Sequence, residues 1–456
     1  MHIGGVSVFE GPAPDHEQLK AHLDERLGLV PRFRQRLAPS PLGLRRPWWV
    51  DDPQFNLDYH LRRSALPHPG SERQLEALVA RVFAQRLDRG KPLWEMYLVE
   101  GLEDGRFALI TKAHHALVDG ISGVDLASVI LDTAPQPTPM GGAVAPFLRR
   151  PAPSRAELIA REAADAARIP LTLTERAIGA IFYPRRITRG LETLGAAVGS
   201  VGWELMNPAP VLPLNGATGP HRRFAARHLS LDMVRSIRRH HNVTVNDVVV
   251  AAATAALREW LIARGVSTDG LELRALVPVN LRTDDERGLL GNRVALLRAP
   301  LPVYIADDEE RLQAVHVTMA QLKRSRQLMA AQAIIELSDF APPTILAQAS
   351  RVNFSTRLFN LIITNVPGPQ LPLYLLGRRL ETVAPIAFLP SGHALAIAVF
   401  SYNGTLSFGL LGDYDRMRDL DTLADGVLDA LERLAPQVQP IGATSDGGGG
   451  GDGALG

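Results

Sequence analysis

A segment rich in proline and glycine, from Ala134 to about Gly219, divides this sequence into two stretches that carry strand and helix patterns. The first stretch opens with a strand pattern at His2–Phe9, and the second opens with one at Arg223–Leu231. In both stretches, strands and helices follow in mixed rather than regularly alternating order. This organisation predicts an α/β protein with two sandwich domains joined by a crossover linker.

We expect the first domain in residues 1–135, the linker in residues 136–214 and the second domain in residues 215–436. Residues 437–456 form a glycine-rich tail with the composition of a disordered segment. Within the linker, Ile187–Leu205 combines an apolar stripe with nearby arginines. Such a helix can lie on a membrane surface, but packing on the body of the protein is the more common outcome.

Apolar spacing, capping residues and turn residues predict the individual elements. The predicted strands are His2–Phe9, Phe55–Arg62, Pro92–Glu100, Arg106–Ala113, Arg223–Leu231, Leu273–Val279, Asn292–Leu301, Phe359–Asn365, Leu395–Tyr402 and Leu406–Asp413. The predicted helices are Asp15–Leu27, Ser71–Leu87, Ser122–Leu131, Asp232–His240, Thr244–Trp260, Asp307–Ser325 and Asp421–Leu434.

Composition excludes several classes of site. The sequence has no cysteine, which removes disulfides, thiolate metal sites and a cysteine nucleophile. A net charge of +1 gives no electrostatic case for nucleic-acid binding. All but four of the 49 basic residues are arginine, and because they are scattered, coding bias explains them better than phosphate recognition. No run of 18 apolar residues predicts a transmembrane helix.

Two adjacent histidines, His114 and His115, follow the predicted strand Arg106–Ala113. Loops held at strand ends by a rigid sheet often carry catalytic side chains, and imidazole is the usual general base near neutral pH. Asp119 can orient a histidine, pair with an arginine or cap the next helix, and Gly120 suits a sharp turn. This pattern favours a catalytic base over a pair of packed core histidines.

Other chemistries fit less well. Two histidines and an aspartate are metal-ligand types, but adjacent side chains on a strand point to opposite faces, and no second ligand cluster is present in the sequence. We therefore predict no metal. The sequence also has neither a G-x-S-x-G elbow nor a Walker phosphate loop.

The run His114-His115-x-x-x-Asp119-Gly120 resembles the signature of chloramphenicol acetyltransferase-like acyltransferases. Further blocks narrow the resemblance to bacterial wax ester synthase/diacylglycerol acyltransferases, in that family's order, from His2 to about Leu434. The blocks are Pro92-Leu93-Trp94, Asn246-Asp247, Pro278-Val279-Asn280-Leu281-Arg282 followed by Gly291-Asn292, and Asn365-Val366-Pro367-Gly368-Pro369. Relatives usually carry a short segment ahead of the stretch that matches Met1–Gly5, so in this chain either the start was assigned late or that segment is missing.

The resemblance implies two chloramphenicol acetyltransferase-like domains with an active-site tunnel at their interface. It implies that His115 is the catalytic base and that His114 points away from the tunnel. Asp119 is expected to pair with Arg282 of the second domain, or otherwise with Arg293. This pair would connect the two domains across the active site.

Three asparagines, Asn246, Asn280 and Asn365, are candidates for positioning substrate or donating a hydrogen bond to an oxyanion. Each can equally be a turn or cap residue. The Pro92-Leu93-Trp94 block opens an apolar strand, and packing explains it better than chemistry.

The resemblance further implies acyl-CoA as co-substrate, no cofactor, and diacylglycerol as acceptor, with long-chain alcohols as the close alternative. A cytoplasmic protein in transient contact with a membrane or lipid droplet is expected, because both substrates are apolar. A catalytically silent lipid-binding protein is an alternative of a different class. A peptide-synthetase condensation domain is a third possible assignment. However, no carrier domain is fused, and the Asn365–Pro369 block favours the wax ester synthase/diacylglycerol acyltransferases.

Overall fold

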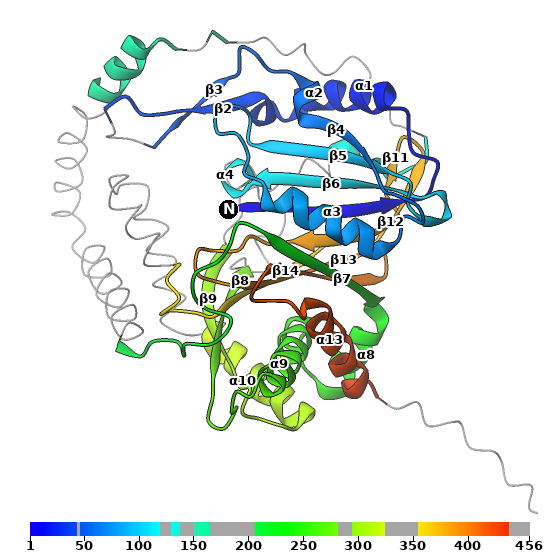
Figure 1. Cartoon of the computed structure of the whole chain (residues 1–456), viewed down its shortest axis with the longest axis vertical. Coiled ribbons are helices and arrows are strands. Elements are labelled where there is room, and N and C mark those ends of the chain that lie inside the picture. The colour runs from blue at the N-terminus through cyan, green and yellow to red at the C-terminus, as the bar shows by residue number, and fades with distance from the viewer. Residues whose placement is uncertain are drawn as a thin grey trace, which may run out of the picture.

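The computed structural model describes residues 1–42, 46–118, 129–136, 150–151, 153–164, 206–280, 294–323 and 354–436. Within these residues the strands form two six-stranded sheets, called sheet 1 and sheet 2 below, and one two-stranded ribbon. Figure 1 shows the sheets facing one another, with helices covering the outer face of each.

Sheet 1 has the strand order β11-β12-β1-β6-β5-β4. Its central strand β1 pairs antiparallel with both β6 and β12, and β5 pairs antiparallel with β6. The strands are β1 (His2–Phe9), β4 (Leu61–Ala65), β5 (Trp94–Glu100), β6 (Phe107–His114), β11 (Tyr374–Leu375) and β12 (Arg378–Ile386).

Sheet 2 has the strand order β7-β14-β13-β10-β8-β9. Its central strand β10 runs parallel to both β13 and β8, and the remaining neighbours are antiparallel. The strands are β7 (Arg222–Ser230), β8 (Leu273–Asn280), β9 (Val294–Leu301), β10 (Leu361–Pro367), β13 (Leu395–Tyr402) and β14 (Thr405–Asp413).

Helices complete the layers. The outer face of sheet 2 packs on α9, α10 and α13, and α1 packs on the outer face of sheet 1. Helix α3 lies between the sheets, where its apolar side joins a core that includes Phe224 of β7. The main helices are α1 (His16–Arg26), α3 (Glu72–Ala84), α8 (Leu231–His241), α9 (Val245–Ala263), α10 (Asp308–Lys323) and α13 (Leu420–Leu434).

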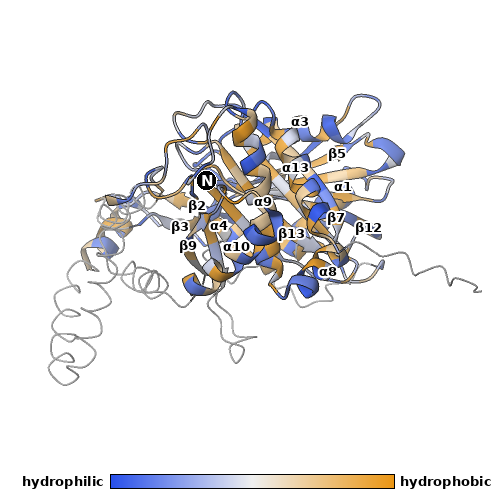
Figure 2. Cartoon of the chain, turned by 90° about the horizontal axis from the view of Figure 1, so that it is seen from below, coloured by the Kyte–Doolittle hydropathy of each residue, from blue (hydrophilic) through white to orange (hydrophobic). Residues whose placement is uncertain are grey.

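Local sequence signals explain where these helices begin. Asp15 caps α1 by accepting hydrogen bonds from two backbone N–H groups, and reciprocal capping boxes open α3 at Ser71 and α9 at Thr244. Each such cap satisfies backbone donors that the first helical turn leaves free. In Figure 2 the hydrophobic colour runs through α9 and the strands, whereas hydrophilic residues gather on outer helices such as α8. The predicted helices at these positions are confirmed.

The predicted strand at Phe55–Arg62 is wrong. The structure has a single helical turn, α2 (Leu57–His60), and β4 begins only at Leu61. The side chain of Asn56 accepts a hydrogen bond from the backbone N–H of Asp58 at 3.0 Å and caps that turn. An asparagine cap therefore overrides the alternation of apolar and polar residues.

The sheets do not divide the chain at one point. Strands β11 and β12 come from the second half of the sequence but join sheet 1, where β12 pairs with β1. The sequence did not predict that strands from the second half would join the sheet of the first half. The domain boundaries at residues 135 and 215 stay a prediction. The predicted helix Ser122–Leu131, except its last residues, the linker segment Ile187–Leu205 and the tail 437–456 lie outside the described residues.

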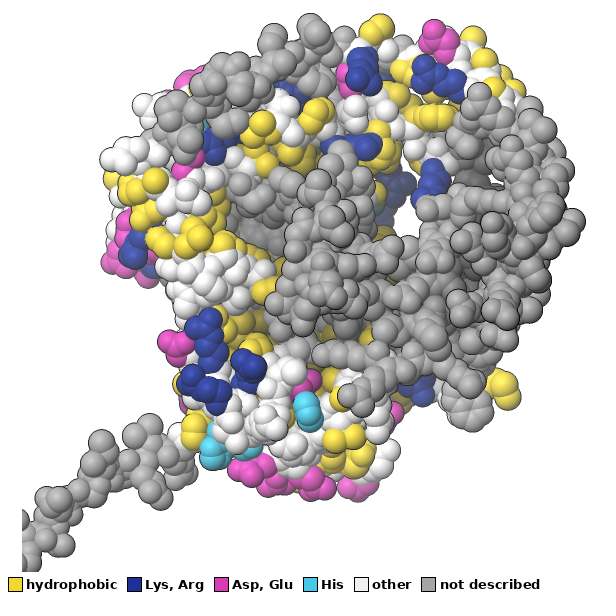
Figure 3. Space-filling view, turned by 180° about the vertical axis from the view of Figure 1, so that it is seen from behind, with side chains coloured by type: hydrophobic (Ala, Val, Ile, Leu, Met, Phe, Trp, Pro, Cys, Tyr) yellow, Lys and Arg dark blue, Asp and Glu magenta, His cyan; other side chains and the backbone are white. Residues whose placement is uncertain are grey.

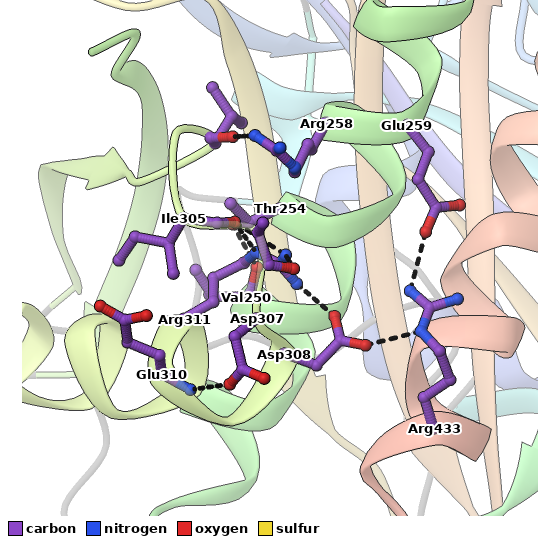
Figure 4. Close-up of polar contacts among 12 residues, drawn as sticks. Val250, Thr254, Arg258, Glu259, Ile305, Asp307, Asp308, Glu310, Arg311 and Arg433 are labelled. Atoms are coloured by element: carbon purple, nitrogen blue, oxygen red, sulfur yellow. Dashed lines mark hydrogen bonds and ion pairs between the residues drawn. The ribbon is translucent and has the colours of Figure 1, made fainter. Parts of the chain in front are cut away.

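A buried charge network joins the helices behind sheet 2 (Figure 4). Arg311 of α10 is 2% exposed and donates to the carbonyl oxygens of Ile305 and Ala306 and to the carboxylate of Asp308. Asp308 also accepts from Arg433 of α13 at 2.6 Å. The network fixes the turn that leads from β9 into α10.

Replacing Arg311 with methionine should lower the free energy of unfolding by about 1–3 kcal/mol, because the buried carbonyl oxygen of Ile305 loses its hydrogen-bond donor, while Asp308 keeps Arg433 as a partner. Arg235→Met is a matched control, since Arg235 and Asp232 form another i, i+3 pair but are both exposed. That control should cost about 1 kcal/mol or less. Urea unfolding of the two variants measures the difference, and equal losses would contradict a stabilising role for the buried network.

Candidate active site

The two motif histidines lie where β6 ends in the middle of sheet 1. The backbone N–H of His114 donates to the carbonyl oxygen of Leu93 at 2.9 Å, and that of His115 donates to the carbonyl oxygen of Met1 at 3.0 Å. A short helix, α4 (His115–Val118), starts immediately, and the N-terminus of the chain lies beside it (Figure 1). Both histidines are therefore fixed through their backbone by neighbouring segments.

His114 caps this short helix. Its Nδ1 accepts a hydrogen bond from the backbone N–H of Ala116 at 3.2 Å, and its ring meets that of His2 edge-to-face at 6.2 Å. Burial, followed by the nearby N-terminal ammonium group, Arg89 and His115, lowers the pKa of His114 to about 4. A neutral His114 near pH 7 keeps Nδ1 available as an acceptor, which fits the expected supporting role.

His115 faces an aromatic side chain from the second half of the chain. Its ring lies 5.5 Å from that of Phe388, at an interplanar angle of 76°. Phe388 is half-buried and follows β12 by two residues. The histidine predicted to be catalytic is thus located beside a residue of the other half, as a site between the two halves requires.

A buried lysine supports the end of β6. Lys112 is 1% exposed and its Nζ donates to the carbonyl oxygens of Val82 and Gln85, at the C-terminal end of α3. The carboxylate of Glu95 lies 3.8 Å away. Burial lowers the pKa of Lys112. Sequence reasoning gave this residue no role, although a lysine among apolar residues of a central strand is itself a signal of a buried partner.

The Pro92-Leu93-Trp94 block packs rather than reacts, as its apolar character suggested. Trp94 is 1% exposed and its Nε1 donates to the carbonyl oxygen of Phe33 at 2.8 Å. The ring of His60 stacks on Trp94 at 4.6 Å, and His60 Nδ1 lies 2.8 Å from the Trp94 carbonyl oxygen. The block therefore anchors the start of β5 against Phe33 and against His60 of α2.

His60 gives a pH dependence of stability. Burial lowers its pKa from 6.5 to about 4, so the folded protein resists protonation while the unfolded chain accepts a proton. Its stabilising contribution is therefore complete above pH 6.5 and is lost as the pH falls towards 4. This loss should reach about 3 kcal/mol. His60→Phe should be less stable at neutral pH but lose less stability on acidification, which urea unfolding at several pH values can measure; parallel losses in both proteins would contradict this.

The predicted asparagines lie in different parts of the second half. Asn246 is half-buried in the first turn of α9, and among the described residues no contact joins it to His115. Asn280 ends β8 and Asn365 lies near the end of β10. Because β8 and β10 are adjacent and parallel, these two residues share one end of sheet 2.

The acidic neighbour of Asn246 has a clearer role. Asp247 is 1% exposed, completes the α9 capping box and lies 2.7 Å from Nδ1 of His316 on α10. This pair ties two helices of the outer layer together. Asp119, Gly120, Arg282 and Arg293 lie outside the described residues, so the pairing across the two halves stays a prediction.

Solved structures with the same arrangement define the class of fold. The wax ester synthase/diacylglycerol acyltransferase from Marinobacter aquaeolei VT8 is 30% identical, with a TM-score of 0.64 over 95% of this chain and 94% of that one. The first condensation domain of the calcium-dependent antibiotic synthetase matches with a TM-score of 0.58 at 16% identity, over 95% and 92% of the two chains. The expected two-domain α/β acyltransferase fold is confirmed.

Sequence relatives narrow the class to a family. Residues 1–249 match the model of the wax ester synthase/diacylglycerol acyltransferase catalytic domain, and residues 290–435 match that of the WS/DGAT C-terminal domain. A Mycobacterium tuberculosis protein named as a probable diacylglycerol O-acyltransferase is 35% identical over 95% of this chain and 91% of its own length. A second one is 35% identical over 96% and 95%. The chain belongs to the wax ester synthase/diacylglycerol acyltransferase family of acyltransferases.

Proposed function

We propose that this protein transfers a fatty acyl group from acyl-CoA to the free hydroxyl of diacylglycerol, forming triacylglycerol. The observation that carries the proposal is the position of His115. It directly follows β6 of sheet 1 as the first residue of α4, is fixed through its backbone to Met1 and lies against Phe388 of the other half. The names of the Mycobacterium relatives support diacylglycerol as the acceptor.

In the proposed reaction, the imidazole of His115 accepts the proton of the acceptor hydroxyl as that oxygen attacks the thioester carbonyl carbon. The carbon–sulfur bond then breaks, and the proton passes from the imidazolium to the departing CoA thiolate. General base catalysis of this kind contributes roughly 10²–10⁴-fold, and holding both substrates together adds an orientation term. No acyl-enzyme and no cofactor are needed.

The supporting roles extend the proposal. Asp119 would pair with Arg282 or Arg293 and hold the motif loop against the second half, and Gly120 would provide its turn. Asn280 and Asn365, which share one end of sheet 2, stay candidates for donating a hydrogen bond to substrate, as does Asn246 in the first turn of α9.

Contact with a membrane or lipid droplet is part of the proposal, because both substrates are apolar. No helix among the described residues is long and apolar enough to span a membrane. Hydrophobic side chains share the described surface with charged ones in Figure 3, and Met206 and Val211 are 79% and 93% exposed.

Labelled palmitoyl-CoA offered with dioleoylglycerol or with hexadecanol tests the activity. We expect labelled triacylglycerol as the main product. Wax ester as the main product would assign the alternative acceptor, which the family name also covers. Binding of lipid without any product would instead indicate a catalytically silent lipid-binding protein.

A further inference from the structure

A depression of about 710 Å³ lies close to the candidate active site. Four hydroxyl side chains line it, those of Thr218, Ser355, Thr356 and Ser391, together with main chain at two glycines and the ring of Phe354. This volume is within the range of small-molecule sites in proteins. The depression is thus large enough for part of a lipid substrate.

Two aromatic rings separate this depression from His115. Phe354, which lines the depression, meets Phe388 edge-to-face at 5.7 Å. Phe388 in turn meets the ring of His115 at 5.5 Å. Both phenylalanines are half-buried, so each keeps one side available to a substrate. Contacts between these two rings therefore link the lining of the depression to the ring of His115.

Phe354 and Phe388 are supported by fully buried side chains of sheet 2. Phe359 is fully buried, lies 6.3 Å from Phe354 and stacks on the buried ring of His393 at 4.2 Å. Phe359 belongs to a core cluster on sheet 2 that includes Leu276 and Ile362, and Phe354 and Phe388 pack against this cluster. Phe359 and His393 are fully buried, so within this aromatic group only the half-buried Phe354 and Phe388 are accessible to a bound molecule.

The chemistry of the depression suits a neutral molecule. None of the residues that line it carries a charge. Arg416 lies next to Gly216, where its guanidinium is engaged by the main-chain carbonyl oxygens of Pro213, Asn215 and Ala217. The phosphates of CoA would call for arginine, lysine or helix N-termini. The hydroxyl side chains instead match the ester and hydroxyl oxygens of an uncharged lipid.

We propose that this depression receives the acyl acceptor and that Phe388, with Phe354, sets the width of the acceptor that reaches His115. The inference rests on the proposed function and adds to it the route of the acceptor and a residue that determines specificity. A long-chain alcohol presents one chain beside its hydroxyl, whereas diacylglycerol presents two. A bulky side chain at position 388 should therefore exclude diacylglycerol more strongly than hexadecanol.

The first test compares kcat/KM for dioleoylglycerol and hexadecanol with palmitoyl-CoA held saturating. Phe388→Ala and the milder Phe388→Leu should raise the ratio of diacylglycerol to alcohol use, by about tenfold for alanine. Phe388→Trp should lower the ratio. Because Phe388→Ala and Phe388→Leu are both measured, the test still stands if one of these two variants fails to fold. A ratio that stays at the wild-type value in active Phe388 variants overturns the inference.

The second test fills the depression itself. Ser391 is exposed at its rim, so Ser391→Trp should raise KM for the acceptor several-fold and leave KM for palmitoyl-CoA unchanged. Ser267→Trp, at an exposed serine outside the lining, is the matched control and should change neither. A rise in KM for palmitoyl-CoA alone would assign the depression to the donor and overturn the inference. If the wild-type protein acylates neither acceptor, the proposed function itself fails, and that result is distinct from an unchanged ratio.

Discussion

Replacement of His115 with alanine is expected to reduce acyl transfer by about 10²–10⁴-fold, the usual contribution of a general base. The loss should appear in kcat, because the imidazole acts on the proton that moves in the reaction and not on the bulk of either substrate. Steady-state kinetics with palmitoyl-CoA and dioleoylglycerol measure both parameters.

The fold should survive this replacement. The hydrogen bond from His115 to the carbonyl oxygen of Met1 is donated by the backbone N–H, which alanine also has. In addition, the ring of His115 is only half-buried, so its removal leaves little empty space in the core. Circular dichroism and the thermal midpoint should therefore match those of the wild type. His240→Ala, at an exposed histidine on α8, controls for the removal of an imidazole. Turnover of His115→Ala within a factor of ten of wild type would rule out the general-base role.

Replacement of Gly409 with alanine is the second change with a large expected effect. Gly409 lies on β14 of sheet 2, and a Cβ there would lie 1.8 Å from the carbonyl oxygen of Pro385 on β12 of sheet 1. Carbon and oxygen atoms that are not bonded cannot approach so closely, so the two sheets must move apart. Pro385 is three residues from Phe388, which faces His115, and the shift therefore reaches the active site.

Displacements of about 1 Å can cost about 10²-fold in rate, and we expect a loss of this size in kcat/KM for Gly409→Ala. Gly426→Ala is the matched control. Gly426 lies inside α13, and the nearest atom to its added Cβ would be the Cβ of Ala256 at 3.5 Å, an ordinary contact. That control should keep full activity and gain up to about 1 kcal/mol of stability. If Gly409→Ala retains wild-type kinetics, the contact between β12 and β14 does not set the active-site geometry.

Local signals account for most of the elements that the sequence predicted correctly. A run of strand-forming residues marks β1, and capping boxes mark the first residues of α3 and α9. Where a local signal was misread, as at Phe55–Arg62, another local signal was responsible, the cap at Asn56. These features depend on residues within a few positions of one another, which is why the sequence is sufficient to predict them.

Contacts between distant segments were harder to predict. The pairing of β12 with β1 brings together residues separated by most of the chain, and no local pattern specifies which free strand edge β12 will join. Phe388 and Gly409 illustrate the same limit. In the sequence, one is a phenylalanine in a loop and the other a glycine in a strand, and only the packing of the two sheets shows that one meets His115 and the other Pro385.

The sequence by itself determined the family and the local setting of the candidate site: paired histidines at the end of a strand, within a set of blocks typical of one acyltransferase family. Only the tertiary structure decided what surrounds them: Lys112 bound to the end of α3, His114 capping α4, and Phe388 between His115 and an uncharged depression. The physical reason is that hydrogen-bonding patterns and side-chain alternation act over a few residues, whereas the neighbours of a side chain across an interface are set by the packing of the whole chain.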